Sequence, residues 1–292
     1  MQALTLLQTS PVFFYTAIGL LGLVVGSFLN VVIQRLPKMM EQEWRRECAA
    51  LMGTAVPDGT SPEKFNLVVP RSRCPHCNHG ITALENIPVL SYLLLRGRCS
   101  ECRKPISIRY PLIETASALI AVFIGIHFGY SAQLLPAILF SWALLVLSVI
   151  DLDHQLLPDD ITLSFLWIGL FFNMFGIFTD IHSSLIGAMA GYGILWTVYM
   201  LFKLVTGKEG MGYGDFKLLS MLGAWLGWQQ LPVIIILSSL CGAMVGIALM
   251  IFRKHDRSHP LPFGPYLAAA GWISMLWGAE ISRAYSQWAL HP

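Results

Sequence analysis

Two groups of residues in this chain have the types and spacing that chemistry requires. The first is a pair of aspartates, Asp151 and Asp215, each at the end of an apolar segment. A carboxylate beside hydrocarbon is costly, and acids in such places are usually functional. Two carboxyl groups that meet can share one proton, so that one takes a proton from water while the other hydrogen-bonds a carbonyl group. The pair therefore predicts acid/base hydrolysis of a peptide bond without a covalent intermediate.

Glycines surround the second aspartate, in the sequence Gly210-Met211-Gly212-Tyr213-Gly214-Asp215. Glycine permits sharp turns and the close approach of another backbone, so an extended peptide could lie against this loop. The alternative is that residues 210–214 form a flexible turn and that Asp215 caps the following helix. A short GxGD pattern has many accidental matches. A second acid on the same face of the membrane favours the catalytic interpretation.

Other acids follow Asp151 closely and have simpler explanations. Asp159 and Asp160 stand directly before the next apolar segment, where a carboxylate accepts hydrogen bonds from free backbone amides. We therefore predict that these two residues cap that helix. Asp153 and His154 fall in the intervening loop, where they are solvated. Asp151 follows an unbroken apolar run and is the acid most in need of a partner.

The second group consists of four cysteines within the extended polar segment at residues 34–110. They form two CxxC pairs separated by 21 residues: Cys74, Cys77, Cys99 and Cys102. This spacing is typical of a four-thiolate zinc site, and a segment with little apolar core would gain folding free energy from a structural metal. Redox dithiols are the alternative, but a redox CxxC normally occurs singly beside the start of a helix. We therefore expect a Zn²⁺ ion here.

The elements that position these groups are membrane helices. The chain is 55% hydrophobic and 12% charged, with a mean hydropathy of +0.61, which excludes an ordinary soluble domain. Helical stretches of about 20 apolar residues cross roughly 30 Å of hydrocarbon. The sixth stretch is the weakest, because it would rise only about 24 Å. Eight segments are predicted to cross, at residues 12–33, 112–130, 134–150, 161–178, 183–204, 216–231, 232–252 and 262–282.

The basic residues orient these segments, because lysine and arginine collect on the cytoplasmic side. Residues 34–110 hold 12 of the 19, and 18 of the 19 fall in the odd-numbered loops, with Arg283 the exception. This bias predicts an N-terminus outside the cytoplasm. The first segment lacks the basic start and cleavage site of a signal peptide, so we expect it to be a mature helix. Asp151 ends the third crossing and Asp215 opens the sixth, so both lie at the cytoplasmic face and can meet.

The expected fold is an all-α polytopic membrane protein, with about eight transmembrane helices and a small zinc-binding cytoplasmic insert between the first two. We divide the chain into three parts. Residues 1–33 form the first transmembrane helix, residues 34–110 form the zinc-binding domain, and residues 111–292 form a transmembrane peptidase domain.

Motifs along nearly the whole chain resemble one family, the bacterial type IV prepilin peptidases, also called prepilin leader peptidase/N-methyltransferases, GxGD aspartic proteases of family A24. Besides the CxxC pairs, the motifs are Gly26-Ser27-Phe28-Leu29-Asn30-Val31-Val32, Glu85-Asn86-Ile87-Pro88, Arg96-Gly97-Arg98-Cys99, Arg109-Tyr110-Pro111-Leu112-Ile113-Glu114, Ile150-Asp151-Leu152-Asp153 and Gly210-Met211-Gly212-Tyr213-Gly214-Asp215-Phe216-Lys217-Leu218.

The resemblance implies two activities at the bacterial inner membrane. The first is cleavage of the basic leader of type IV prepilins and type II secretion pseudopilins, with Asp151 and Asp215 as the catalytic pair. The second is methylation of the new N-terminal amine by S-adenosyl-L-methionine, attributed to the cysteine-containing domain and placed near Gly97 and Arg98. Only the resemblance supports methyl transfer, because the insert has no GxGxxG motif and is too short for a Rossmann methyltransferase.

The expected partners are prepilins, pseudopilins and membrane lipid, with no nucleic acid, and the sequence predicts no oligomeric state. Glu85, Glu101 and Glu114 could attract a basic leader, although solvated surface or helix-terminus roles are the simpler interpretation. Three other functions remain open. The chain could be a non-catalytic zinc-containing membrane assembly factor, a cation transporter, or another GxGD intramembrane protease without methyl transfer.

Overall fold

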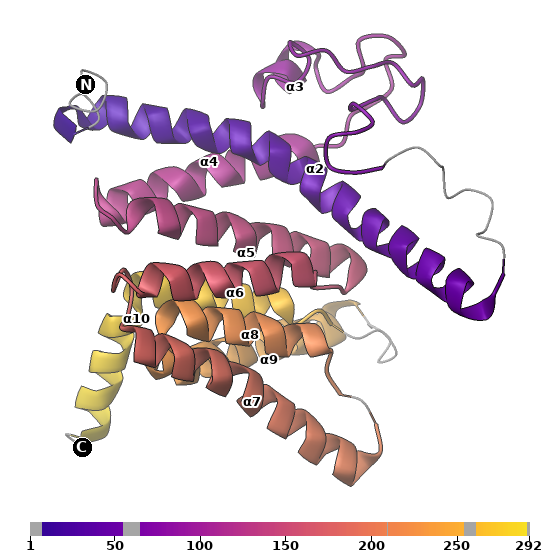
Figure 1. The fold of residues 1–292 in the computed structure, drawn as a ribbon. Coiled ribbons are helices and arrows are strands. Elements are labelled where there is room, and N and C mark those ends of the chain that lie inside the picture. The colour runs from indigo at the N-terminus through magenta and orange to yellow at the C-terminus, as the bar shows by residue number, and fades with distance from the viewer. Residues whose placement is uncertain (1–7, 55–64, 209, 254–260, 291–292) are drawn as a thin grey trace. The chain divides into compact units, whose positions relative to one another are not determined.

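The structure is a computed structural model that describes residues 8–54, 65–208, 210–253 and 261–290 (Figure 1). The chain divides into two compact units, residues 1–134 and 135–292. In the described ranges, the regular elements are helices, accompanied by two isolated β-bridges. The first unit holds α2 (Pro11–Met52), α3 (Leu90–Leu94) and α4 (Arg109–Phe128). The second holds α5 (Leu134–His154), α6 (Asp159–Asn173), α7 (Ile181–Thr206), α8 (Tyr213–Leu226), the 3₁₀ turn η1 (Trp228–Gln230), α9 (Leu231–Arg253) and α10 (Gly264–Leu290).

Small residues let α2 and α4 pack closely in the first unit (Figure 1). A Cβ atom added at Gly22 would lie 2.6 Å from the Cα atom of Ala118, and one added at Gly26 would lie 2.7 Å from the Cα atom of Glu114. Ser117 then donates a hydrogen bond of 2.7 Å to the carbonyl oxygen of Gly22. Close backbone approach with interhelical hydrogen bonds is a common way to join helices in a membrane.

The helix α2 is much longer than the segment that was predicted to cross the membrane. It continues from Pro11 through Pro37 to Met52, and ends at Gly53, whose φ of 62° is the left-handed conformation that favours glycine. Residues 34–52, which were assigned to the polar insert, therefore continue the helix of the predicted first crossing.

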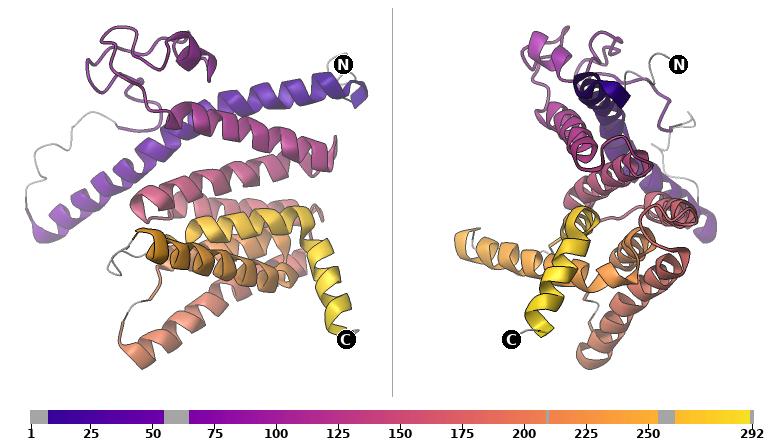
Figure 2. Two further views of the ribbon diagram at one scale, coloured as in Figure 1. Left: turned by 180° about the vertical axis from the view of Figure 1, so that it is seen from behind. Right: turned by 90° about the vertical axis from the view of Figure 1, so that its left-hand side faces the viewer.

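The centre of the second unit is α8, whose residues from Leu218 to Leu226 are all buried. It packs on α6, α7 and α10, and α9 runs beside α10 (Figure 2). Gly187 and Gly223 face each other where α7 meets α8, with no room for a side chain on either. Asn173 ties the end of α6 to α8, because its amide donates hydrogen bonds of 2.9 Å to the carbonyl oxygens of Ala224 and Trp225. The short α8 is therefore a fixed central element.

The predicted all-α membrane fold, with four cysteines between its first two long helices, is confirmed. Each of the eight predicted segments coincides with a helix. Among the described residues, five helical segments are long and apolar enough to cross a membrane: α2, α4, α5, α7 and Trp228–Ile251. The helices α6 and α8 have 15 and 14 residues, which is short of the roughly 20 needed to cross. The number of crossings therefore stays a prediction.

Candidate active site and metal centre

Asp151 lies in the last turn of α5 and is buried, with 6% of its surface exposed. The backbone N–H group of Gly264, at the start of α10, donates a hydrogen bond of 3.0 Å to its Oδ2 atom. A helix N-terminus carries free N–H groups and partial positive charge, which suit a carboxylate. The third and eighth predicted crossings thus meet at this acid.

Asp215 lies in the first turn of α8 and is also buried, with 8% of its surface exposed. The N-cap of α8 is Gly212, and no side chain makes a capping hydrogen bond there. The alternative that Asp215 caps this helix is therefore wrong.

The structure brings the two aspartates into one neighbourhood within the second unit. Leu157 packs against the glycine beside each acid, Gly214 next to Asp215 and Gly264 next to Asp151. A Cβ atom added at Gly214 would lie 2.9 Å from the Cβ atom of Leu157, and one added at Gly264 would lie 3.2 Å from its Cδ2 atom. Two buried acids therefore share a partly apolar site, the arrangement that proton sharing requires.

An aromatic cluster fixes the loop and helix that carry Asp215. The ring of Phe216 lies 5.4 Å from Tyr213, 5.6 Å from Tyr199 and 5.8 Å from Tyr192, measured between ring centroids. Tyr192 and Tyr199 belong to α7, whereas Tyr213 and Phe216 flank the aspartate on α8. Such tilted and edge-on ring pairs pack favourably. They hold the first turn of α8 against α7 and so position the acid.

Gly264 is a site residue that the sequence reasoning missed. A Cβ atom added there would lie 2.6 Å from Oδ2 and 3.1 Å from Cγ of Asp151. The signal in the sequence was Phe263-Gly264-Pro265 directly before an apolar segment, because proline is favoured in the first turn of a helix. That pattern indicates where α10 begins, but not which side chain its first amide binds.

The prediction that Asp159 and Asp160 cap the fourth crossing is wrong. Both lie in the first turn of α6, but the N-cap position belongs to Pro158, and no side chain caps the helix. Asp159 instead forms an ion pair with Lys217, whose Nζ atom lies 2.6 Å from Oδ2 and 2.8 Å from Oδ1. The lysine lies two residues beyond Asp215, so this partly exposed pair joins the start of α6 to the site.

The four predicted zinc ligands come together in the first unit. Their sulfur atoms all lie within 4.8 Å of one another. The Sγ atoms of Cys74 and Cys102 are 3.8 Å apart, and those of Cys77 and Cys99 are 3.9 Å apart. A tetrahedron with Zn–S bonds of about 2.3 Å has sulfur atoms about 3.8 Å apart. The thiols therefore fit a zinc ion.

The two CxxC segments form matching turns. In the first, the amide of Cys74 donates to the carbonyl oxygen of His79, and in the second the amide of Cys99 donates to Lys104, both at 2.9 Å. Amide hydrogen bonds from His76 and Cys77 lower the pKa of Cys74 to about 6. Corresponding bonds from Cys102 and Glu101 lower the pKa of Cys99. These bonds favour the thiolates of Cys74 and Cys99, the form that binds metal, whereas burial and the three neighbouring thiols raise the pKa of Cys77 to about 12.

Glu85 links the two turns and is not simply a solvated acid. Its Oε1 atom accepts a hydrogen bond from Ser100 in the second turn, and its Oε2 atom accepts bonds of 2.8 Å and 2.9 Å from Thr82. His79, beside the first turn, lies 3.3 Å from Oε2. Bonds from Ser100 and Thr82 lower the pKa of Glu85 to about 2. The carboxylate of Glu85 therefore joins the two zinc-binding turns through these hydrogen bonds.

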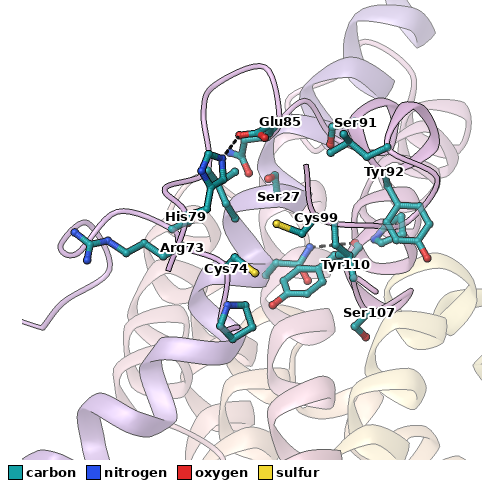
Figure 3. A pocket seen from close by; sticks show the side chains of 18 of the residues that line it. Ser27, Arg73, Cys74, His79, Glu85, Ser91, Tyr92, Cys99, Ser107 and Tyr110 are labelled. Carbon is teal, nitrogen blue, oxygen red and sulfur yellow. Dashed lines mark hydrogen bonds and ion pairs between the residues drawn. The ribbon is translucent and has the colours of Figure 1, made fainter. Parts of the chain in front are cut away.

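Gly97 and Arg98 occupy different environments in the same unit. Gly97 is buried with a φ of 67°, and a Cβ atom added there would lie 2.9 Å from both Cζ and Oη of Tyr92. Arg98 is exposed. Tyr92 lines a cavity of about 450 Å³, whose walls also include Ser27, Tyr110 and two of the cysteines (Figure 3). No local sequence pattern predicts this cavity, because its walls come from α2, α4 and the polar insert.

Comparison with known proteins matches both halves of the chain to peptidase families. Residues 20–128 match the family model for the bacterial peptidase A24 N-terminal domain, and residues 138–247 match that of the type IV leader peptidase family. A prepilin leader peptidase/N-methyltransferase of Aeromonas hydrophila is 55% identical over 277 residues, which cover 94% of each chain. Proteins of the same name from Pseudomonas aeruginosa and Dichelobacter nodosus are 52% and 47% identical, over 99% and 96% of each chain. No solved structure is significantly similar.

Proposed function

Because the chain belongs to the prepilin leader peptidase/N-methyltransferase family, we propose that Asp151 and Asp215 form the dyad of its peptidase reaction. The carrying observation is that both carboxyl groups are buried and that Leu157 packs against the glycine beside each of them, Gly214 and Gly264. The amide of Gly264 donates to Asp151, which suits an ionised carboxylate that takes a proton from the attacking water. Asp215 holds the shared proton and donates a hydrogen bond to the scissile carbonyl oxygen.

The substrates that we propose are prepilins and pseudopilins, which present a basic leader before a hydrophobic stem. Cleavage where the stem enters the membrane needs an acid pair at the boundary of the bilayer. The bias of 18 of 19 basic residues toward one set of loops supports a dyad at the cytoplasmic face of the inner membrane, with the N-terminus in the periplasm. In the domain division that we propose, the peptidase domain is residues 111–292, preceded by a first helix at residues 1–33 and the zinc-binding domain at residues 34–110.

The second activity, N-methylation, uses S-adenosylmethionine, which supplies an electrophilic methyl group when it is bound. We propose that the enzyme transfers this methyl group to the N-terminal amine exposed by cleavage. The name of the relatives supports this activity, and the family resemblance attributes it to the insert that carries Gly97, which lies in the first unit. The peptidase and methyltransferase sites then belong to separate units of the chain.

Product masses test both activities. Purified protein in detergent is incubated with a prepilin, with and without S-adenosylmethionine, and the products are analysed by mass spectrometry. We expect loss of the leader in both reactions and a gain of one methyl group only with the donor. An unchanged mass in both would contradict the enzymatic assignment and favour an assembly factor or a transporter. Cleavage without a gain of a methyl group would indicate a GxGD protease that lacks methyltransferase activity.

The metal that we propose for the four cysteines is a structural Zn²⁺ ion, supported by the sulfur separations of 3.8 Å and 3.9 Å. Metal analysis is expected to give one zinc ion per chain. Replacing Cys74 by serine should remove most of it and expose residues 65–108 to protease, because a small polar segment depends on its metal. Cys48→Ser is the matched control, since that exposed cysteine lies outside the cluster. Full zinc content in the Cys74 variant would disprove the site.

A further inference from the structure

The cavity of the first unit has the size and composition of a small-molecule site. Its volume of about 450 Å³ falls within the range of roughly 300–1,000 Å³ that is usual for ligand pockets. Its walls combine one face of α2, the start of α4, the helix α3 and both zinc-binding turns (Figure 3). The zinc-binding turns therefore form part of the wall of this cavity.

One wall carries a buried acid that the peptidase reaction does not use. Glu114 of α4 has 8% of its surface exposed. Its carboxylate accepts a hydrogen bond of 2.8 Å from the amide of Val89 and another from the hydroxyl of Ser27. Both donors are uncharged, so they do not neutralise a negative charge. A buried carboxylate of this kind favours a cationic ligand, because a nearby positive charge offsets its loss of hydration.

The backbone near this acid supports a functional role. Val89, whose amide binds Glu114, has a φ of 59°, a conformation that a β-branched residue rarely adopts. Backbone held in such a conformation occurs preferentially at ligand sites, where the surroundings impose it. The interpretation of Glu114 as a solvated surface acid is therefore wrong.

Two aromatic side chains lie in other walls of the cavity. The hydroxyl of Tyr110 accepts a hydrogen bond of 2.5 Å from Gln34, and the carbonyl oxygen of the same residue accepts one of 3.1 Å from the buried amide of Asn30. These bonds hold Tyr110, in the first turn of α4, against α2. Tyr92 comes from α3. Aromatic rings suit both a planar base and a cationic sulfur, the latter through attraction to the ring face.

Gly97 is needed for the position of Tyr92. Any side chain at residue 97 would meet the Tyr92 ring at 2.9 Å, and the φ of 67° disfavours other residues there. Gly97 itself does not line the cavity, and neither does Arg98. The glycine is therefore a positioning residue that acts through the tyrosine.

We propose that this cavity binds S-adenosylmethionine, with Glu114 as the acidic group for the positive charge of the donor and with Tyr92 and Tyr110 as its aromatic walls. The inference rests on the methyltransferase activity of the family and assigns that activity a site. S-Adenosylmethionine combines a flat base, a sulfonium cation and polar groups. The cavity offers aromatic rings for the base and a carboxylate for the cation.

Direct binding measurements test the site independently of catalysis. The dissociation constant of S-adenosylmethionine is measured by calorimetry on full-length zinc-loaded protein in detergent. Glu114→Gln and Tyr92→Leu are each expected to raise it about tenfold or more, which corresponds to about 1.4 kcal/mol. Glu47→Gln removes a charge from an exposed part of α2 outside the cavity and should bind like wild type. Wild-type affinity in both cavity variants would overturn the proposal.

Leader cleavage and zinc content report whether the variants fold, and both should stay at wild-type levels. If a variant does not fold, photo-crosslinking of labelled S-adenosylmethionine to the wild-type protein decides the question. We expect labelled peptides from residues 27–34 or 85–114, and labelling confined to residues 135–292 would disprove the site. If the wild-type protein methylates pilin but is labelled only within residues 135–292, this cavity is not the donor site, and the methyltransferase assignment stands. A wild-type protein that neither methylates nor binds the donor would refute the methyltransferase assignment itself.

Discussion

Replacing either Asp151 or Asp215 by asparagine is expected to lower the rate of leader cleavage by roughly 10²- to 10⁴-fold, the usual contribution of a general acid or base. Asparagine keeps the size of the side chain but cannot accept or hold the proton that the pair shares. The rate is measured with purified variants and a prepilin in detergent, from the appearance of the shortened product.

The same substitutions should leave the fold intact. Both carboxyl groups are buried, and two acids at close range repel each other when both are ionised. Removing one of them should therefore leave the thermal unfolding temperature unchanged or raise it. A loss of activity without a loss of stability distinguishes a catalytic acid from a structural one, because active-site groups are often retained at the expense of stability.

The matched control is Asp160→Asn, which alters an exposed acid in the first turn of α6. This variant should cleave at nearly the wild-type rate. Both dyad variants should still methylate a pilin that already lacks its leader, since the proposed donor site lies in the first unit. Near wild-type cleavage by either dyad variant would remove that residue from the mechanism.

The sequence was most informative where one local rule determines the outcome. The CxxC spacing predicted the four ligands of one cluster, because each pair forms its own turn. Apolar length predicted the position of every long helix but not all of their ends, because α2 and α10 continue well beyond the predicted segments and α6 and α8 end before them. Burial in hydrocarbon identified Asp151 and Asp215 among 17 acidic residues, because few other roles explain acids at such positions.

The sequence was least informative where a contact joins distant segments. Gly264 binds Asp151 across 113 residues, and Lys217 draws Asp159 into an ion pair across 58. No local pattern encodes either contact. The capping prediction failed because Pro158 holds the N-cap position, and Asp159 pairs with a lysine on another helix. Likewise, α2 continues through Pro37, although proline usually breaks a helix.

The Gly264 contact leads to the second large effect. Gly264→Ala is expected to lower the turnover number for leader cleavage by about 10²-fold, the scale of loss that follows a misplacement of about 1 Å. The added methyl group would lie 2.6 Å from the Oδ2 atom of Asp151, so either the carboxylate or the start of α10 must move. The alanine still has a backbone N–H group, so the expected loss comes from geometry and not from a missing donor.

Gly193→Ala is the matched control, because a Cβ atom added at that glycine of α7 would meet nothing within 4 Å. It should retain full activity and gain a little stability, since alanine favours a helix over glycine by up to about 1 kcal/mol. For Gly264→Ala, the turnover number should fall while KM stays nearly constant, because the substrate still binds and only the acid is displaced. If substrate affinity fell by the same factor as the turnover number, the result would indicate a disturbed fold. If the turnover number were unchanged, the amide of Gly264 would not position Asp151.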